Sequence, residues 1–205
     1  MIERRRFGEA RVLLDQAFQR YGSTCRLLAA YGELENAVGD RERALYWYRR
    51  AVRADSAAAA AWSGLAEVQY SLSHFASAES SYAAAARTDR SGRAFVNLGI
   101  FQLRRGELAR AESAFVAAGR KLGENAELLY NEACLEAIRG RHEKAITLLD
   151  RAARSGLRGA AAIAADPDLA ALRTRPGYEA FAARVRSSDA SAPRRPERQA
   201  PAQSK

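Results

Sequence analysis

The sequence Ala44-Leu-Tyr-Trp-Tyr-Arg-Arg-Ala51 contains a spacing that returns along the chain at a nearly constant period. A small residue is followed four positions later by a large apolar residue, and three positions after that by an alanine. Spacings of four and three place these residues on one face of a helix. The copies are Ala10/Leu14/Ala17, Ala44/Tyr48/Ala51, Ala78/Tyr82/Ala85, Ala111/Phe115/Ala118 and Ala145/Leu149/Ala152. Their first residues are 34, 34, 33 and 34 positions apart, which predicts a repeated helical unit.

A second pattern precedes the first at a constant distance and predicts another helix in each unit. It places a large apolar residue three positions before a Leu or Tyr, as in Trp62-x-x-Leu65 and Phe95-x-x-Leu98. Turn residues separate the two patterns, at Gly39, Ser73, Gly106 and Gly140. Each unit is therefore expected to be two helices joined by a short turn. We predict helices over residues 3–20, 25–37, 41–54, 59–71, 75–88, 92–104, 108–121, 126–138 and 142–154.

Composition favours an all-α protein. Ala, Leu, Arg and Glu dominate the chain, and these are strong helix formers. Three of the five prolines lie within the last thirteen residues, so nearly all of the chain before them is free to be helical. No run of alternating β-branched and aromatic residues predicts a strand.

The period and its two patterns resemble the tetratricopeptide repeat over about residues 1–155. This resemblance implies a right-handed superhelical solenoid of antiparallel helix pairs, with about four full units after an N-terminal half-unit. The later segment Asp166-Pro-Asp-Leu-Ala-Ala-Leu-Arg-Thr-Arg-Pro176 is similar to the segment that closes many bacterial tetratricopeptide arrays. Asp166 as N-cap and Pro167 as the first helical residue open a short helix, and a last helix follows. We expect these helices to cap the solenoid.

Small residues mark the close contacts inside each unit. Gly32, Ala66, Gly99 and Ala133 hold equivalent places on the first helices, opposite the alanines of the second helices. The fifth unit departs from the family pattern, because Glu132 stands where a large apolar residue is usual. We therefore expect the helix over 126–138 to pack less tightly than its equivalents.

The two ends of the chain differ in composition. We assign residues 1–186 to the solenoid with its capping helices, and residues 187–205 to a disordered tail rich in Pro, Ser, Ala and Arg. Residues 3–20 match a second helix whose partner is missing, so either a helix precedes this sequence or a lone helix opens the stack. Its apolar stripe is Phe7, Ala10, Leu14, Ala17 and Phe18. An uncovered stripe predicts an interaction surface, and self-association through it is one outcome.

The formal net charge of +9 invites a polyanion-binding interpretation. Lysine occurs only at three positions, and acidic residues are interleaved with the arginines, so the charge is better explained as solvated helix surface. We therefore expect no nucleic-acid partner. The N-terminus lacks the apolar core of a signal peptide, and no stretch is long and apolar enough for a membrane span. We expect a cytoplasmic protein.

No motif for catalysis or for a cofactor stands out. Cys25 and Cys134 are 109 residues apart and form neither a disulfide framework nor a zinc motif. His142-Glu143 is not followed by the second histidine of a zinc-protease motif, and His74 lies in a predicted turn. We expect no enzyme activity, no cofactor and no metal.

The resemblance places a ligand on the concave face, which the first helices line. Asn97 and Asn131 hold the same place in consecutive units, and a side-chain amide can clamp a peptide backbone. The family uses asparagines at this place with basic neighbours that grip a carboxylate, a role open here to Arg93 and Arg104. The same inward rows include Glu67, Tyr70 and Tyr130. The alternative, that both asparagines are ordinary surface residues, stays open.

A non-catalytic adaptor or scaffold that binds a partner peptide or helix is therefore the favoured function. The equivalent places in the earlier units hold Ala30 and Gly64, so the full carboxylate clamp of chaperone-binding members is not reproduced. Two alternatives belong to other classes: an RNA-associated helical-repeat protein, which the charge suggests, and a secretion-type chaperone, which is disfavoured because such proteins are often acidic.

Overall fold

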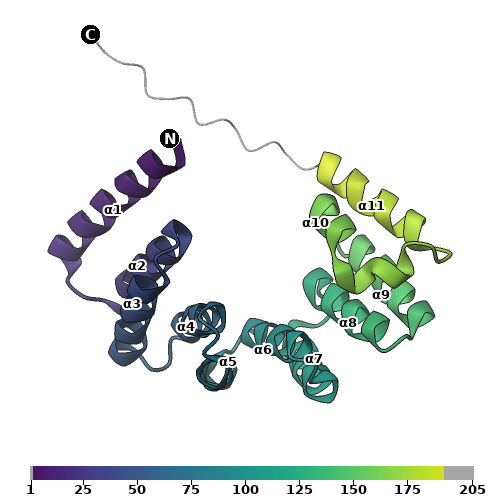
Figure 1. Cartoon of the computed structure of the whole chain (residues 1–205), viewed down its shortest axis with the longest axis horizontal. Helices are drawn as coiled ribbons and strands as arrows, with labels where there is room; N and C mark the ends of the chain where they lie inside the picture. The colour runs from purple at the N-terminus through teal and green to yellow at the C-terminus, as the bar shows by residue number, and fades with distance from the viewer. Residues whose placement is uncertain (1, 192–205) are drawn as a thin grey trace, which may run out of the picture.

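The computed structural model describes residues 2–191, with side chains from residue 6 onward, as an arc of helices (Figure 1). The helices are α1 (Ile2–Tyr21), α2 (Cys25–Val38), α3 (Arg41–Ala54), α4 (Ala59–Ser71), α5 (Phe75–Thr88), α6 (Arg93–Arg104), α7 (Leu108–Leu122), α8 (Ala126–Ile138), α9 (His142–Arg154), α10 (Ala160–Ala165), the 3₁₀ helix η1 (Pro167–Leu172) and α11 (Tyr178–Ala190). No strand occurs within residues 2–191. Every helix predicted by its residue range is confirmed, with both ends within one residue.

Successive helices pair into antiparallel hairpins, and one helix of each pair lines the inner side of the arc. Helix α2 packs on α3, α4 on α5, α6 on α7, and α8 on α9. Figure 1 shows α5 and α7 on the outer side. The first helices α2, α4, α6 and α8 also contact one another in order, which builds a continuous inner surface.

Small residues allow the close approach of the helices, as predicted. The alanines at 44, 78, 111 and 145 are fully buried. A Cβ atom added at Gly32 would lie 2.8 Å from the Tyr48 ring, and one added at Gly99 would overlap the Phe115 ring. Because the interior is packed this closely, a side chain at either glycine would displace the ring.

One buried polar residue per unit was not predicted from the sequence. These residues are Glu35, Gln69, Gln102 and Glu136, at steps of 34, 33 and 34. The backbone carbonyl of each accepts a hydrogen bond of 2.8–2.9 Å from the N–H five residues later, which closes the turn of its unit. Their side chains find different partners: Gln69 accepts from the Ser81 hydroxyl at 2.7 Å, and Glu136 pairs with Lys144 at 3.1 Å.

The C-terminal helices cover the last unit, as the capping prediction requires. The Asp166 carboxylate caps η1 by accepting from the Asp168 N–H at 3.0 Å, with Pro167 at the first helical position. Leu169 and Leu172 of η1 are fully buried, and η1 contacts both α8 and α9. Helix α11 packs on α9 through buried apolar residues, namely Tyr178, Phe181 and Val185.

Three details differ from the sequence-based predictions. The short helix α10 was not predicted. Looser packing of α8 was expected and is wrong, because η1 covers its inner side and seven of its residues are buried. Helix α11 continues four residues beyond the predicted boundary at 186, and Asp189 accepts hydrogen bonds from the N–H groups of Gly159 and Ala160. Residues 192–205 of the predicted tail lie outside the described residues.

Helix α1 packs on α2 at the N-terminal end of the arc. The predicted apolar stripe faces α2 and is half-buried: Phe18 contacts the Tyr31 ring, and Asp15 accepts a hydrogen bond from the Tyr31 hydroxyl at 2.6 Å. The exposed large apolar residues of α1 are instead Val12, Leu13 and Tyr21, at 55%, 65% and 63% exposure. Self-association through α1 stays a prediction.

Candidate binding groove

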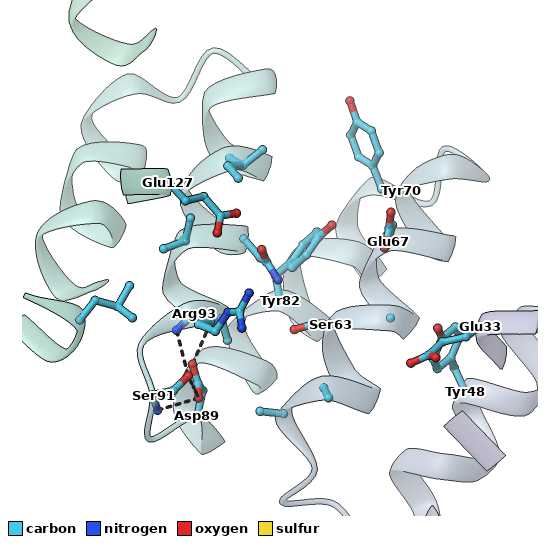
Figure 2. A pocket seen from close by; sticks show the side chains of 18 of the residues that line it. Glu33, Tyr48, Ser63, Glu67, Tyr70, Tyr82, Asp89, Ser91, Arg93 and Glu127 are labelled. Carbon is cyan, nitrogen blue, oxygen red and sulfur yellow. Dashed lines mark hydrogen bonds between the residues drawn. The ribbon is translucent and has the colours of Figure 1, made fainter. Parts of the chain in front are cut away.

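A groove of about 960 Å³ lies on the inner side of the arc, between α2 and the start of α8. Residues from α2, α4 and α6 line it, together with tyrosines from α3 and α5 and the loop before α6. Figure 2 shows Glu33 and Tyr48 on one side of this groove and Arg93 and Glu127 on the opposite side. The inner surface of three successive units is therefore open.

Five of the seven predicted binding residues line this groove: Glu67, Tyr70, Arg93, Asn97 and Arg104. The Arg104 guanidinium lies over the Tyr70 ring, 5.8 Å from its centroid, which is a cation–π distance. The Asn97 side chain is half-buried, and its amide makes no hydrogen bond to any residue between 2 and 191. Its donor and acceptor both remain available to a ligand.

The other two predicted residues, Asn131 and Tyr130, do not line the groove. The Asn131 side-chain amide donates to the backbone carbonyl of Glu127, one turn earlier in α8, at 2.8 Å. The Tyr130 hydroxyl donates to the Asp166 carboxylate of the capping segment. Burial and this hydrogen bond raise the pKa of Tyr130 far above its usual value. Both side chains are therefore engaged within the chain.

The capping segment closes the inner surface over α8. Burial raises the pKa of Cys134, on this side of α8, to about 12, with a further contribution from Asp166. Burial also raises the pKa of Asp168, and the nearby Arg104 partly opposes that rise. The groove thus ends where η1 begins to cover the next unit, and Arg104 lies at that boundary.

Two tyrosines of the groove were not predicted as site residues, because they belong to the packing pattern of the second helices. Tyr48 and Tyr82 are 5% and 9% exposed, and neither hydroxyl has a hydrogen-bond partner within the described chain. A Cβ atom added at Gly64 would lie 2.7 Å from the Tyr48 hydroxyl and would overlap its ring. The missing side chain at Gly64 is what opens the groove to Tyr48.

Burial dominates the ionisation of both tyrosines. It raises the pKa of Tyr82 to about 12, and the nearby Glu67 adds to the rise while Arg104 opposes it. Burial also raises the pKa of Tyr48, with Glu33 and Glu67 adding to the rise. Both phenols are therefore neutral at physiological pH and can donate a hydrogen bond into the groove.

Hydrogen bonds to the Asp89 carboxylate hold the loop before α6 in place. The Asp89 carboxylate accepts hydrogen bonds from the Ala94 N–H at 2.8 Å and from the Ser91 hydroxyl at 2.8 Å (Figure 2). Burial acts to raise the pKa of Asp89, but these hydrogen bonds outweigh it and lower the pKa below its usual value. This carboxylate is used to fix the start of α6, which carries Arg93 and Asn97.

Among the side chains that the structure describes, from residue 6 to residue 191, no group of three or more His, Cys, Asp or Glu is placed to hold a metal ion. No helix in the described part of the chain is long and apolar enough to cross a membrane.

No family model matches the sequence, and no curated protein matches it significantly. Solved structures do match the fold. PilF of Pseudomonas aeruginosa is 22% identical, with a TM-score of 0.66, over 78% of this chain and 73% of that one. YrrB, described as a TPR protein with an unusual peptide-binding site, is 19% identical, with a TM-score of 0.56, over 87% and 93% of the two chains.

The APC/C heterotetramer Cut9–Hcn1 also matches, at 17% identity and a TM-score of 0.65 over 71% of this chain. The chain spans only 28% of the length of that protein. Together with the helix pairing and the 34-residue period, these structures confirm the predicted fold, a right-handed tetratricopeptide solenoid.

Proposed function

We propose that the chain is a non-catalytic adaptor that binds a segment of a partner protein in the groove over α2, α4 and α6. The observation that carries this proposal is that Asn97, Arg93 and Arg104 all line one open groove. The side chains of these three residues form no ion pair and no hydrogen bond with any other side chain or backbone group that the structure describes.

The chemistry of these groups suits a peptide in extended conformation. The Asn97 amide can pair with both the N–H and the carbonyl of one peptide unit, whatever the side chain of that residue. Each guanidinium group suits a carboxylate of the bound segment, because arginine can bind a carboxylate through two parallel hydrogen bonds. Arg93 and Arg104 stand at the two ends of α6, so they would contact different points of the segment. The fixed loop at Asp89 and the helix α6 hold these groups in place, which lowers the entropy cost of binding.

Similarity to YrrB, whose description names a peptide-binding site, adds support from the fold alone. The alternative of an RNA partner is not favoured for this groove, because Glu33, Glu67 and Glu127 line it and would repel phosphates. A secretion-type chaperone is not favoured either, since the chain is basic. A cytoplasmic location stays a prediction.

The test compares what the wild-type chain and groove variants retain from an extract of their own cells. We expect mass spectrometry to find proteins held by wild type and by Asn131→Ala but lost from the double variant Asn97→Ala/Arg104→Ala. Asn131 is the matched control, because its amide is bonded within α8 and lies outside the groove. Equal retention by the double variant would move the binding surface elsewhere.

A further inference from the structure

The groove contains carboxylates without partners in a protein whose net charge is +9. Glu33 of α2 and Glu67 of α4 are exposed and line the groove, and neither forms an ion pair or a side-chain hydrogen bond within residues 2–191. Carboxylates on other surfaces are commonly paired, such as Glu79 with Arg110 and Glu112 with Arg139. With 33 basic residues in the chain, an unpaired acidic pair facing one groove leaves a site for an external cation.

Two buried phenols point to the same kind of ligand independently of the charges. Tyr48 and Tyr82 are more than nine-tenths buried, yet their hydroxyls reach the groove without a hydrogen-bond partner in the described chain. Tyr48 is near both Glu33 and Glu67, and Tyr82 is near Glu67. A cationic side chain placed between the carboxylates would meet a phenol hydroxyl as well as two negative charges.

The opposite side of the groove carries two arginines, with Glu127 of α8 beside Arg93 (Figure 2). Arg93 and Arg104 lie on α6, which packs beside α4, and the Asn97 amide lies between them in the helix. Axes of packed helices are about 8–10 Å apart. That distance corresponds to about three residues of an extended peptide. The glutamates on α2 and α4 and the arginines on α6 therefore lie on neighbouring helices, a spacing that a short extended peptide can span.

We propose that the bound segment is dipolar: an arginine or lysine lies between Glu33 and Glu67 beside the Tyr48 hydroxyl, and a carboxylate about three residues away lies at Arg93 or Arg104, which mark the two ends of α6. This rests on the proposed function, since it names the class of peptide that the same groove selects. The Asn97 amide holds the backbone between the two charged side chains.

The experiment is a selection from a random peptide library displayed on phage, using the full-length chain as bait. We expect the selected peptides to carry Arg or Lys about three residues from Asp, Glu or the C-terminal carboxylate. The same selection on Glu33→Gln/Glu67→Gln should lose the basic residue from the consensus. Glu143→Gln is the matched control, because Glu143 is an exposed helical glutamate on α9, outside the groove.

A synthetic peptide made from the wild-type consensus then gives the size of the effect. Glu33→Gln and Glu67→Gln should each weaken its binding about 5- to 30-fold, more at low salt than at high salt. Tyr48→Phe removes one hydroxyl and should weaken binding by a smaller factor. Glu143→Gln should leave the affinity unchanged.

The outcomes separate the two proposals. Peptides that carry no preferred basic residue, and that lose affinity in Asn97→Ala/Arg104→Ala but not in the glutamate variants, would overturn the dipolar ligand and leave the groove function standing. If wild type selects no peptide at all, or if no groove variant alters binding, both proposals fail. Circular dichroism of each variant checks that the helices are intact.

Discussion

The inner surface of this solenoid is open over α4 and α6 but closed over α8, although the three are equivalent first helices of successive units. Asn97 and Asn131 hold equivalent positions, yet the first faces the groove and the second is bonded within its own helix. Beside Asn131, the Tyr130 hydroxyl donates to Asp166, and the segment η1 lies against α8 and buries Leu169 and Leu172. The surface that a repeat offers to a ligand therefore depends on which segment of the chain lies over it.

The residues that the two regions place on the inner face also differ in a consistent way. Over the open region they include charged and amide side chains, with the Tyr48 phenol reached through the gap at Gly64. Over α8 they are Tyr130 and the buried Cys134, which the capping segment covers. The inner face is therefore polar and open over α4 and α6, whereas over α8 it is covered by the capping segment.

The largest expected effect comes from breaking the closed region. Leu172→Asp buries a charge in a fully apolar site, and we expect it to destabilise the C-terminal region by about 3–5 kcal/mol. The exposed neighbour gives the matched control, Ala171→Asp, which should cost much less.

The thiol of Cys134 reports whether α8 has been uncovered. Burial raises its pKa to about 12, so wild type in a Cys25→Ser background should react slowly with maleimide at pH ~8. Leu172→Asp should speed this reaction strongly. If the thiol stays as unreactive as in wild type, the capping segment is not what closes α8.

The next effect concerns the repeat contacts that both regions share. Ala78→Arg and Ala111→Arg force a long charged side chain into a fully buried helix contact, and we expect each to destabilise by about 3 kcal/mol. Ala109→Arg, on the exposed side of α7, is the control and should be nearly neutral. Thermal unfolding measures all three variants. If Ala78→Arg and Ala111→Arg melt at the same temperature as the Ala109→Arg control, the assigned contact face is wrong.

A smaller effect tests how the groove is opened. Gly64→Ala would normally stabilise a helix interior, but its Cβ atom would overlap the Tyr48 ring, so we expect a loss of about 1–3 kcal/mol. The matched control is Gly8→Ala in α1, where no atom lies within 4 Å of the added Cβ atom. That control should gain roughly 0.5–1 kcal/mol of stability. Chemical denaturation tests this, because Gly64→Ala should lower the free energy of unfolding and Gly8→Ala should raise it.

The asparagine comparison predicts a difference in binding rather than in stability. Truncating Asn97 to alanine should cost about 1–2 kcal/mol of affinity for the captured partner, a factor of about 5–30. Asn131→Ala should cost nothing measurable. Arg104→Ala should weaken binding more at low salt, as a partly exposed charge contact does. If a titration shows that both asparagine variants lose the same affinity for the partner, the difference between the open and closed regions is contradicted.

Most of the fold was predictable because the signals are local. The alanine and aromatic spacings fix each helix face, and residues such as Gly39 and Gly106 fix the turns, so the nine predicted helices agree with the structure at both ends. Helix α10 was missed because its six residues are mostly alanine and carry no apolar periodicity. The buried polar row that includes Gln69 follows the same period, and a search for one repeated polar position would have found it.

The groove was only partly predictable, because helical spacing gives the direction of a side chain and not what covers it. It placed Arg93, Asn97 and Arg104 together in the groove. It did not show that Tyr130 pairs with Asp166, since those residues are 36 positions apart and meet only when η1 folds back. Nor did it show that Gly64 opens a path to Tyr48, because that depends on packing between two units.

The smallest expected effect concerns where the closed region ends. The predicted boundary at residue 186 would leave Asp189 in the tail, whereas its carboxylate accepts hydrogen bonds from the N–H groups of Ala160 and Gly159 at 2.7 and 2.9 Å. These hydrogen bonds lower the pKa of Asp189 below its usual value, so the charged form is favoured in the folded chain. Its contribution is therefore present above the unfolded pKa of about 3.9 and is lost as the pH falls through the lower folded pKa. Asp189→Asn should lower the melting temperature slightly at pH ~7, and the difference from wild type should shrink as the pH falls below about 4. A difference that is absent at neutral pH would mean that residues beyond 186 do not hold α10 in place, and the closed region would then end at the predicted boundary.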